Sequence, residues 1–192
     1  MTDAEYILGI KNNDNSKISA FVSAYSSRVY NVAISITQNK EDAEEVSQDV
    51  FVKIMKSISK FDEKSSLSTW VYRIATNTAL DYLRKKKSRS WLSFSQIWSS
   101  EEEDSPSKEF AVDFVHPGVQ LEQQENAKIL FSLLEKLPER QKAAFVLNKL
   151  EDLSYKEIAQ TLEITETTVD SLLSRAKANL KNLLKGKNIL QL

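Results

Sequence analysis

Cysteine is absent from the 192 residues, which excludes disulfide bonds, thiol nucleophiles and cysteine-ligated zinc. The single histidine, His116, precedes Pro117 and Gly118, and no second histidine could join it in a metal site or a catalytic triad. The three glycines, Gly9, Gly118 and Gly186, lie too far apart to form a phosphate-binding loop. We therefore expect no metal and no other cofactor.

Long hydrophobic runs are also missing. No segment approaches the roughly 18 consecutive apolar residues that cross a bilayer. Residues 1–6 contain neither the basic region nor the apolar core of a signal peptide. We expect a cytoplasmic protein without membrane insertion.

Few residues are available for sharp turns, because the chain has only 3 glycines and 3 prolines. Hydrophobic residues make up 41% of the sequence, which is enough to bury a core, and long segments are rich in Ala, Leu, Glu and Lys. This composition predicts an all-α fold. We expect two small helical domains, at residues 1–89 and 121–192, joined by an acidic flexible linker at 90–120.

The net charge of −1 hides an uneven distribution along the chain. Residues 81–90 carry five basic residues and one acidic residue, whereas residues 91–126 carry one basic residue and eight acidic residues. Residues 127–192 are again basic, with eleven basic and eight acidic residues. Two locally basic modules around an acidic connector indicate contact with a polyanion.

Helical periodicity divides the N-terminal part into three segments. One or two helices are predicted over residues 16–37, and a helix follows over 42–58, with Asn39 as its cap. A polar break at 62–68 precedes a third helix that starts near Thr69 and enters the basic run 84–89. The pattern then dissolves from about Ser88 to Gly118, which predicts the linker.

The C-terminal part carries a sharper signal. Pro138 suits the first turn of a helix. Ser154 and Glu157 form a capping box that opens a short helix at 154–161, and a longer helix begins near residue 166. A short helix, a tight turn and a basic-ended second helix is the layout of a helix-turn-helix, although a plain helical hairpin has the same spacing. Glu163 stands in the turn, where glycine is common.

Several readings stay open on spacing alone. The polar stripe of the helix at 69–89 is compatible with a solvated face, and equally with a surface that stacks on and hydrogen-bonds unpaired bases. Trp70 by itself is a core residue or a stacking platform. Asp42, Glu45 and Asp49 imitate a metal-binding face, but neighbouring lysines and the lack of histidine argue against an enzyme. A stand-alone helix-turn-helix regulator and a structural adaptor are the remaining alternatives.

Two sets of motifs together resemble the extracytoplasmic-function (ECF) sigma factors. NKEDAEEVSQDVFVKI at 39–54, Phe61 and STWVYRIATNTALDYLR at 68–84 resemble their region-2 domain. LPERQ at 137–141, LSYKEIA at 153–159 and TVDSLLSRAK at 168–177 resemble their region-4 domain. The resemblance implies a non-catalytic protein that binds core RNA polymerase, directs it to promoters and promotes DNA melting.

The resemblance also implies which residues bind each of three partners: core polymerase, the −10 element and the −35 element. Core polymerase would be bound by Asp42, Glu45, Asp49, Phe51, Lys53 and Lys56. The −10 element would be bound and opened by Phe61, Lys64, Ser65, Ser66, Thr69, Trp70, Arg73, Asn77, Asp81, Arg84 and Lys85. The −35 element would be bound by Thr167, Thr168, Asp170, Ser171, Ser174, Arg175 and Lys177. An anti-sigma factor would be a further partner.

Two features concern specificity and the linker. Asp170 and Leu172 stand where similar proteins often carry basic residues. An acid does not bond phosphate but accepts a hydrogen bond from a cytosine amino group, so the −35 role is retained while the sequence does not fix the promoter bases. About 30 linker residues reach roughly 100 Å when extended, enough to separate two DNA-binding domains. The acidic linker is either a tether or a mimic of RNA in the polymerase channel.

Overall fold

The computed structural model describes residues 1–97 and 124–186. Within those ranges every regular element is helical, as predicted. The elements are α1 (Asp3–Lys11), α2 (Asn15–Thr37), α3 (Lys40–Ser57), the 3₁₀ helix η1 (Ile58–Lys60), α4 (Leu67–Ile97), α5 (Gln124–Leu134), α6 (Glu139–Lys149), α7 (Tyr155–Leu162) and α8 (Glu166–Gly186).

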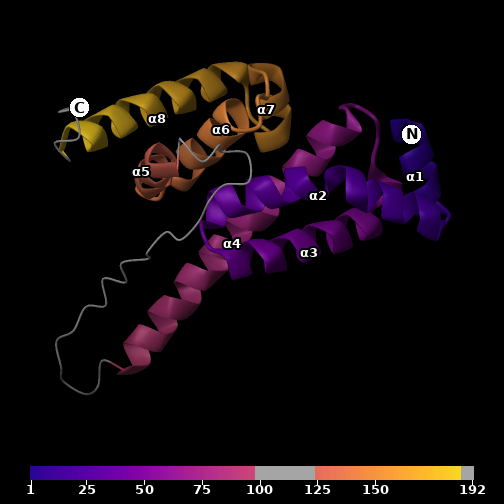
Figure 1. Cartoon of the computed structure of the whole chain (residues 1–192), viewed down its shortest axis with the longest axis horizontal. Coiled ribbons are helices and arrows are strands. Elements are labelled where there is room, and N and C mark those ends of the chain that lie inside the picture. Colours follow the sequence, from indigo (N-terminus) through magenta and orange to yellow (C-terminus); the bar gives the residue numbers. More distant parts are fainter. Residues whose placement is uncertain (98–123, 187–192) are drawn as a thin grey trace.

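The N-terminal domain is a bundle in which α2, α3 and α4 pack side by side (Figure 1). The apolar residues at helical spacing form its core, and Phe21, Val29, Val50 and Ile54 have no exposed surface. The side chain of Asn39 accepts a hydrogen bond from the backbone N–H of Asp42 at 2.8 Å, so the predicted cap of α3 is confirmed. These contacts fix the direction in which α3 and α4 present their polar faces.

The sequence interpretation missed helix α1. Thr2 and Glu5 form a capping box at its start, and this short motif was the signal that could have revealed the helix. Ile7 and Ile10 are buried against the rest of the bundle. Gly9 lets α1 approach α2 closely, because a Cβ atom at position 9 would lie 2.3 Å from the Cβ of Lys17.

Helix α4 is longer than expected. It begins at Leu67, where Ser66 accepts a hydrogen bond from the N–H of Thr69 at 3.1 Å, and it continues to Ile97. The break in hydrophobic periodicity near Ser88 therefore does not end the helix, since residues 88–97 contain no glycine or proline that would stop it. The predicted linker begins as helix at 90–97, and its remainder, 98–120, lies outside the described residues.

The C-terminal domain contains the predicted helix-turn-helix. Ser154 and Glu157 satisfy each other's backbone groups in the expected capping box at the start of α7. The turn passes through Glu163, whose φ of 54° lies in the left-handed region. Helix α8 follows and buries Val169, Leu173 and Ala176. A glutamate at this position costs more than a glycine would, because the left-handed region crowds the Cβ atom.

The two domains pack against each other. Helix α7 contacts α4, and α6 contacts α2 (Figure 1). One hydrophobic core runs through both domains, joining Val71 and Ala75 of α4 to Ala144, Leu153 and other residues of the C-terminal domain. A second, smaller core of α5, α6 and α8 residues includes Phe131, Leu134 and Leu180.

Candidate functional site

The polar face of α3 is the first candidate surface. Glu45, Asp49, Lys53 and Lys56 are exposed on it, as predicted. Asp42 is not: its exposed fraction is 7%, so the expectation that it lies on the open face of the helix is wrong. The reason is that α4 crosses the start of α3 and supplies partners for the carboxylate.

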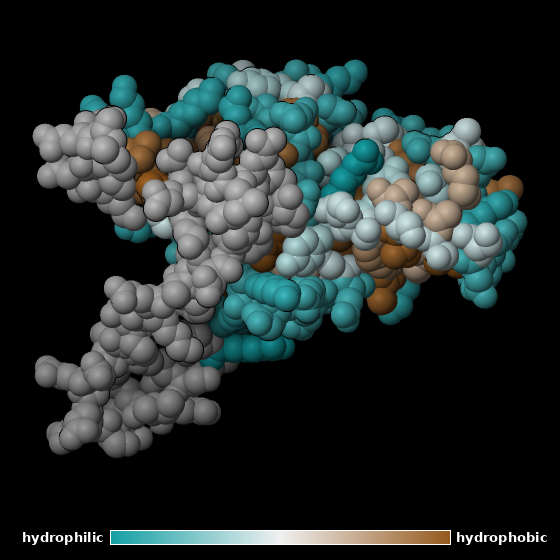
Figure 2. All heavy atoms as spheres, in the orientation of Figure 1, coloured by the Kyte–Doolittle hydropathy of each residue, from teal (hydrophilic) through white to brown (hydrophobic). Residues whose placement is uncertain are grey.

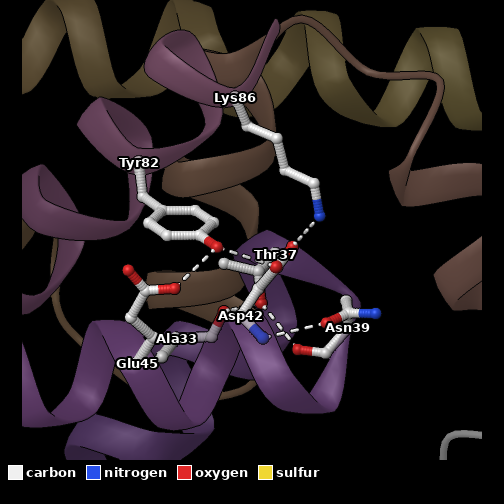
Figure 3. A network of polar contacts seen from close by, with 7 residues as sticks. All are labelled: Ala33, Thr37, Asn39, Asp42, Glu45, Tyr82 and Lys86. Carbon is white, nitrogen blue, oxygen red and sulfur yellow. Dashed lines mark hydrogen bonds and ion pairs between the residues drawn. The ribbon is translucent and has the colours of Figure 1, made fainter. Parts of the chain in front are cut away.

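Those partners come from the middle of α4 (Figure 3). The hydroxyl of Tyr82 lies 2.9 Å from Asp42 Oδ1 and 3.0 Å from Glu45 Oε2, and Lys86 Nζ lies 2.6 Å from Asp42 Oδ2. Burial and the two carboxylates raise the pKa of Tyr82, so its hydroxyl remains a donor. Asp42 therefore ties α3 to α4.

Two further residues of α3 were missed by the sequence interpretation. Val52 is 49% exposed, and Gln48 is exposed beside Asp49. Phe51 is half-buried, and its ring packs edge-on against Phe21 with 6.3 Å between centroids. The sequence alone does not show that Val52 is exposed. Val52 stands between the apolar Phe51 and the charged Lys53, so it could belong to either the buried or the exposed face of the helix. Figure 2 shows a largely hydrophilic surface, on which hydrophobic residues emerge at the end occupied by α1 and also at the opposite end of the molecule.

A groove separates the polar faces of α3 and α4. Its volume is about 440 Å³. Acidic residues of α3, among them Glu45 and Asp49, face basic residues of α4 across it, and Lys53 donates to the hydroxyl of Thr78 at 3.0 Å. The basic residues of α4 that line the groove are Lys85, Lys86 and Arg89, and Lys53 lines it from α3. The groove connects the two polar surfaces of the N-terminal domain.

The aromatic residues predicted to bind the −10 element lie inside the bundle. Phe61 and Trp70 have exposed fractions of 8% and 7%, and their rings lie 5.2 Å apart. Of the two interpretations that the sequence left open for Trp70, its burial against Phe61 agrees with the core residue and not with an exposed stacking platform. Thr69, from the same set, is also buried, with 4% of its surface exposed.

The loop at 62–66 is open to solvent. Lys64 pairs with Asp62 at 2.7 Å, and this contact lowers the pKa of Asp62 and raises that of Lys64. Ser65 is half-buried, and the hydroxyl of Ser66 contacts that of Thr69 at 2.8 Å. The loop therefore presents hydroxyl groups and one ammonium group next to the buried Trp70.

The remaining polar residues of α4 divide into two groups. Asn77 and Lys85 are exposed. Arg73 and Arg84 contact glutamates of the C-terminal domain: Arg73 lies 3.2 Å from Glu163, and Arg84 lies 3.3 Å from Glu139. Arg84 also pairs with Asp81 at 2.9 Å within α4. This placement across a domain boundary is invisible in the sequence.

Helix α8 carries the third candidate surface. The seven polar residues predicted to bind the −35 element are all exposed, and they lie on the face opposite its buried apolar stripe. The hydroxyl of Thr168 contacts that of Thr165 at 2.8 Å, and the hydroxyl of Ser171 donates to the carbonyl of Thr167 at 3.0 Å. Arg175 and Lys177 are the cations of this face. The set is Thr167, Thr168, Asp170, Ser171, Ser174, Arg175 and Lys177.

Comparison with known families accounts for both domains. Residues 21–89 match the family described as Sigma-70 region 2, and residues 127–180 match Sigma-70, region 4. These matches cover the three-helix bundle and the helix-turn-helix, in the order that sigma factors have. The protein is thus of the sigma-70 class, whose members direct RNA polymerase to promoters.

Curated relatives narrow the class. The chain is 28% identical over 176 residues to the ECF RNA polymerase sigma factor SigW of Bacillus subtilis, covering 92% of this chain and 93% of that protein. It is 30% identical over 182 residues to the ECF RNA polymerase sigma-E factor of Haemophilus influenzae, covering 95% of each. The chain belongs to the ECF sigma factors.

Two solved structures share the fold. CnrH, in complex with the cytosolic domain of CnrY, has a TM-score of 0.66 and 20% identity, covering 96% of this chain and 97% of that one. RpoE of Bartonella quintana, in complex with the anti-sigma factor NepR, has a TM-score of 0.64 and 22% identity, covering 87% and 96%.

Two features are absent from residues 1–97 and 124–186. None of the helices there is both long and apolar enough to cross a membrane. No group of three or more His, Cys, Asp or Glu side chains in this part of the chain is arranged to hold a metal ion.

Proposed function

We propose that this ECF sigma factor divides promoter recognition among three helical faces. Exposed residues of α3 bind core RNA polymerase, the loop at 62–66 and α4 bind and open the −10 element, and α8 binds the −35 element. In residue numbers, 1–89 form the polymerase and −10 domain, 90–120 the linker, and 121–192 the −35 domain. The protein acts without catalysis of its own, in the cytoplasm.

The observation that carries the proposal is the exposure of the α8 face. Seven polar residues lie together on the first turns of the second helix of a helix-turn-helix, above buried Val169 and Leu173. The N-terminal turns of that helix enter the major groove in such domains. Arg175 offers bidentate hydrogen bonds to guanine, and Asp170 offers an acceptor to a cytosine amino group.

On α3, the proposed polymerase contact consists of Glu45, Asp49, Lys53 and Lys56, with Val52 as its apolar centre. An exposed valine among charged residues supplies the apolar area that stabilises a protein interface, while the charges set its specificity. Asp42 acts in this scheme as a positioning residue, because it holds α3 and α4 together.

On α4, Asn77, Arg84 and Lys85 contact the duplex or the separated strand. Trp70 and Phe61 support the loop that receives an extruded base. Opening a base pair costs a few kcal/mol, which contacts to the captured base offset. No covalent step is required.

An anti-sigma factor is a proposed partner. Support comes from Bartonella quintana RpoE, which was solved with the anti-sigma factor NepR and has the same fold. The surface available to such a partner is the exposed face of α3, with Glu45, Asp49 and Val52.

The test is run-off transcription with purified core polymerase on genomic fragments, beginning with the promoter upstream of the protein's own gene. We expect specific start sites only when the protein is present. Asp49→Arg should abolish co-elution with core polymerase, whereas Arg175→Ala should retain co-elution and weaken promoter binding by about 1–3 kcal/mol. Lys181→Ala, exposed further along α8, is the matched control.

A gel-shift assay separates this proposal from a stand-alone regulator. A sigma factor of this kind binds promoters tightly only together with core polymerase. Tight duplex binding by the protein alone, with no effect on start-site selection, would reject the proposal.

A further inference from the structure

One tyrosine of α4 lies between the surface proposed for polymerase and the surface proposed for DNA (Figure 3). The hydroxyl of Tyr82 lies 2.9 Å from Asp42 Oδ1 and 3.0 Å from Glu45 Oε2. Glu45 is exposed on the polymerase face of α3, whereas Asp42 is buried and also binds Lys86. Tyr82 was not among the residues predicted to bind either partner.

The hydroxyl of Tyr82 is shared between two acceptors. It carries one hydrogen, so it donates to only one of the two carboxylates at a time. Burial and the two carboxylates raise the pKa of Tyr82, which keeps that hydrogen in place. The hydrogen goes to the carboxylate with more uncompensated negative charge, because charge strengthens a hydrogen-bond acceptor. A change of charge at either carboxylate therefore changes which one Tyr82 serves.

Lys86 sets the balance between the two acceptors. Its ammonium group lies 2.6 Å from Asp42 Oδ2 and compensates the charge of that carboxylate. The side chain of Lys86 is 51% exposed, so the ammonium group is also accessible from outside the bundle. Its neighbour Lys85 belongs to the proposed DNA surface, and both lysines line the groove between α3 and α4. A DNA phosphate competes with a carboxylate for such an ammonium group.

Loss of Lys86 from Asp42 redirects the hydrogen of Tyr82. Asp42 is then a buried carboxylate without its cation, and an unpaired buried charge is costly. It takes the Tyr82 hydroxyl, and Glu45 loses this donor. Because Glu45 is exposed, its carboxylate is then available to a cation of another protein.

The two helices need not move for this exchange. Lys53 of α3 donates to the hydroxyl of Thr78 at 3.0 Å, one turn of α4 before Tyr82. Val46 and Val50 of α3 have no exposed surface, and α3 packs along α4. Close packing of this kind holds the spacing of the helices. The exchange of partners is therefore confined to side chains.

We propose that Tyr82 is a positioning residue and Lys86 a DNA contact, linked by this exchange. A DNA phosphate takes Lys86, Asp42 takes the Tyr82 hydroxyl, and Glu45 becomes available to core polymerase. Such coupling is reciprocal, so polymerase bound at Glu45 also loosens Lys86 from Asp42 and strengthens DNA binding. The inference rests on the proposed roles of α3 and α4.

The affinity for core polymerase is the direct readout. The chain has no cysteine, so Ser27→Cys, exposed on α2 outside the proposed binding faces, takes a single dye. Fluorescence anisotropy then measures the Kd for purified core polymerase, with and without the promoter fragment that run-off transcription identifies. In the parent protein we expect the fragment to tighten core binding about ten- to hundredfold.

Tyr82→Phe should tighten core binding about two- to fivefold in the absence of DNA, because Glu45 then has no donor in α4. The same variant should reduce the gain produced by DNA about three- to tenfold. A merely structural role of the hydroxyl predicts weaker core binding instead. Tyr30→Phe removes the hydroxyl of another half-buried tyrosine, outside the network, and should change neither value. Circular dichroism reports whether each variant keeps its helices.

A second pair of variants tests the lysine. Lys86→Ala should tighten core binding without DNA as Tyr82→Phe does, because Asp42 then takes the Tyr82 hydroxyl. Lys87→Ala makes the same change in charge at an exposed neighbour that does not line the groove, and it should leave this Kd unchanged.

The coupling is overturned if Tyr82→Phe weakens core binding or behaves like Tyr30→Phe. It is also overturned if Lys86→Ala behaves like Lys87→Ala. Failure of the parent protein to bind core polymerase would instead refute the proposed role of α3, and the coupling would fall with it.

Discussion

Asp42 was expected to be exposed on α3, but in the structure it is buried and contacts α4. Its position in the first turn of α3 is consistent with both an exposed partner contact and a stabilising charge near the helix N-terminus. In the structure its carboxylate lies within 3 Å of Tyr82 and Lys86. Removing it takes away the acceptor of the Lys86 ammonium group and leaves the Tyr82 hydroxyl with Glu45 as its acceptor.

We therefore predict that Asp42→Ala lowers the free energy of unfolding by about 1–3 kcal/mol. Tyr82→Phe should cost about 0.5–1.5 kcal/mol, since only one neutral donor is lost. Urea denaturation of the full chain measures both. Glu41→Ala, an exposed neighbouring carboxylate, is the control, and an equal loss in that variant would contradict the role assigned to Asp42.

Glu151 makes the domain contact sensitive to pH. Burial raises its pKa from the usual 4.5 to about 7, although the hydrogen bond from Tyr72 and the charge of Arg28 act in the opposite direction. Asp152 and Glu157 are the nearby acids of its own domain. Packing of the two domains against each other therefore takes up a proton. The contribution of Glu151 is complete below the pKa of the solvated carboxyl group and is lost as the pH rises through about 7.

The free energy of unfolding should accordingly rise as the pH falls from about 8 to about 5.5. Urea denaturation of the full chain at a series of pH values measures it. Glu151→Gln should show a flatter response and keep its stability at pH values where the parent protein loses stability. A difference between the two proteins that does not depend on pH, or that grows as the pH falls, would contradict this prediction.

At the level of elements, the packing of α1 against α2 requires a close approach of the two helix backbones at Gly9. Gly9 and Lys17 face each other where α1 turns into α2, and an added Cβ atom would overlap the Cβ of Lys17. A rotamer change of Lys17 cannot relieve this overlap, because the Cβ atom moves only with the backbone.

Gly9→Ala should therefore destabilise the docking of α1 by about 1–3 kcal/mol, despite the gain of about 1 kcal/mol in helix propensity. Faster hydrogen exchange of the α1 amides, with α2–α4 unchanged, is the expected result. Ala4→Gly, an exposed change in the same helix, tests propensity alone. Slower exchange in Gly9→Ala would show that the contact adapts.

The local sequence pattern predicted where α3 and α7 begin, but it did not predict where α4 ends. Asn39, Ser154 and Glu157 signalled helix starts because capping uses side chains within three residues of the cap. The continuation of α4 past Ser88 was missed, since loss of hydrophobic periodicity marks the end of a buried face and not the end of a helix. A solvent-exposed helix needs no apolar stripe to continue.

At the scale of the whole molecule, packing of the two domains buries the charged side chain of Lys142. Removing this ammonium group from water costs free energy of desolvation. Its exposed fraction is 7%, and burial lowers its pKa. Its one described hydrogen-bond acceptor is the carbonyl of Ile36. Replacing a buried charge by an apolar side chain of similar size is often neutral or stabilising.

Lys142→Met should therefore raise the thermal midpoint, corresponding to about 1–3 kcal/mol. Calorimetry measures the effect, and Lys136→Met, at an exposed lysine, is the control. If Lys142→Met lowers the midpoint, the ammonium group is a net stabilising contact between the domains.

The sequence by itself determined the helices, their amphipathic faces, the helix-turn-helix and the family, because these depend on spacing and capping within short stretches of chain. Only the tertiary structure decided that Asp42 and Trp70 are buried and that Glu139, Glu151 and Glu163 meet α4. Those contacts join residues 55 to 90 positions apart. Periodicity specifies which side of a helix is apolar, but it does not specify which other helix will cover the polar side.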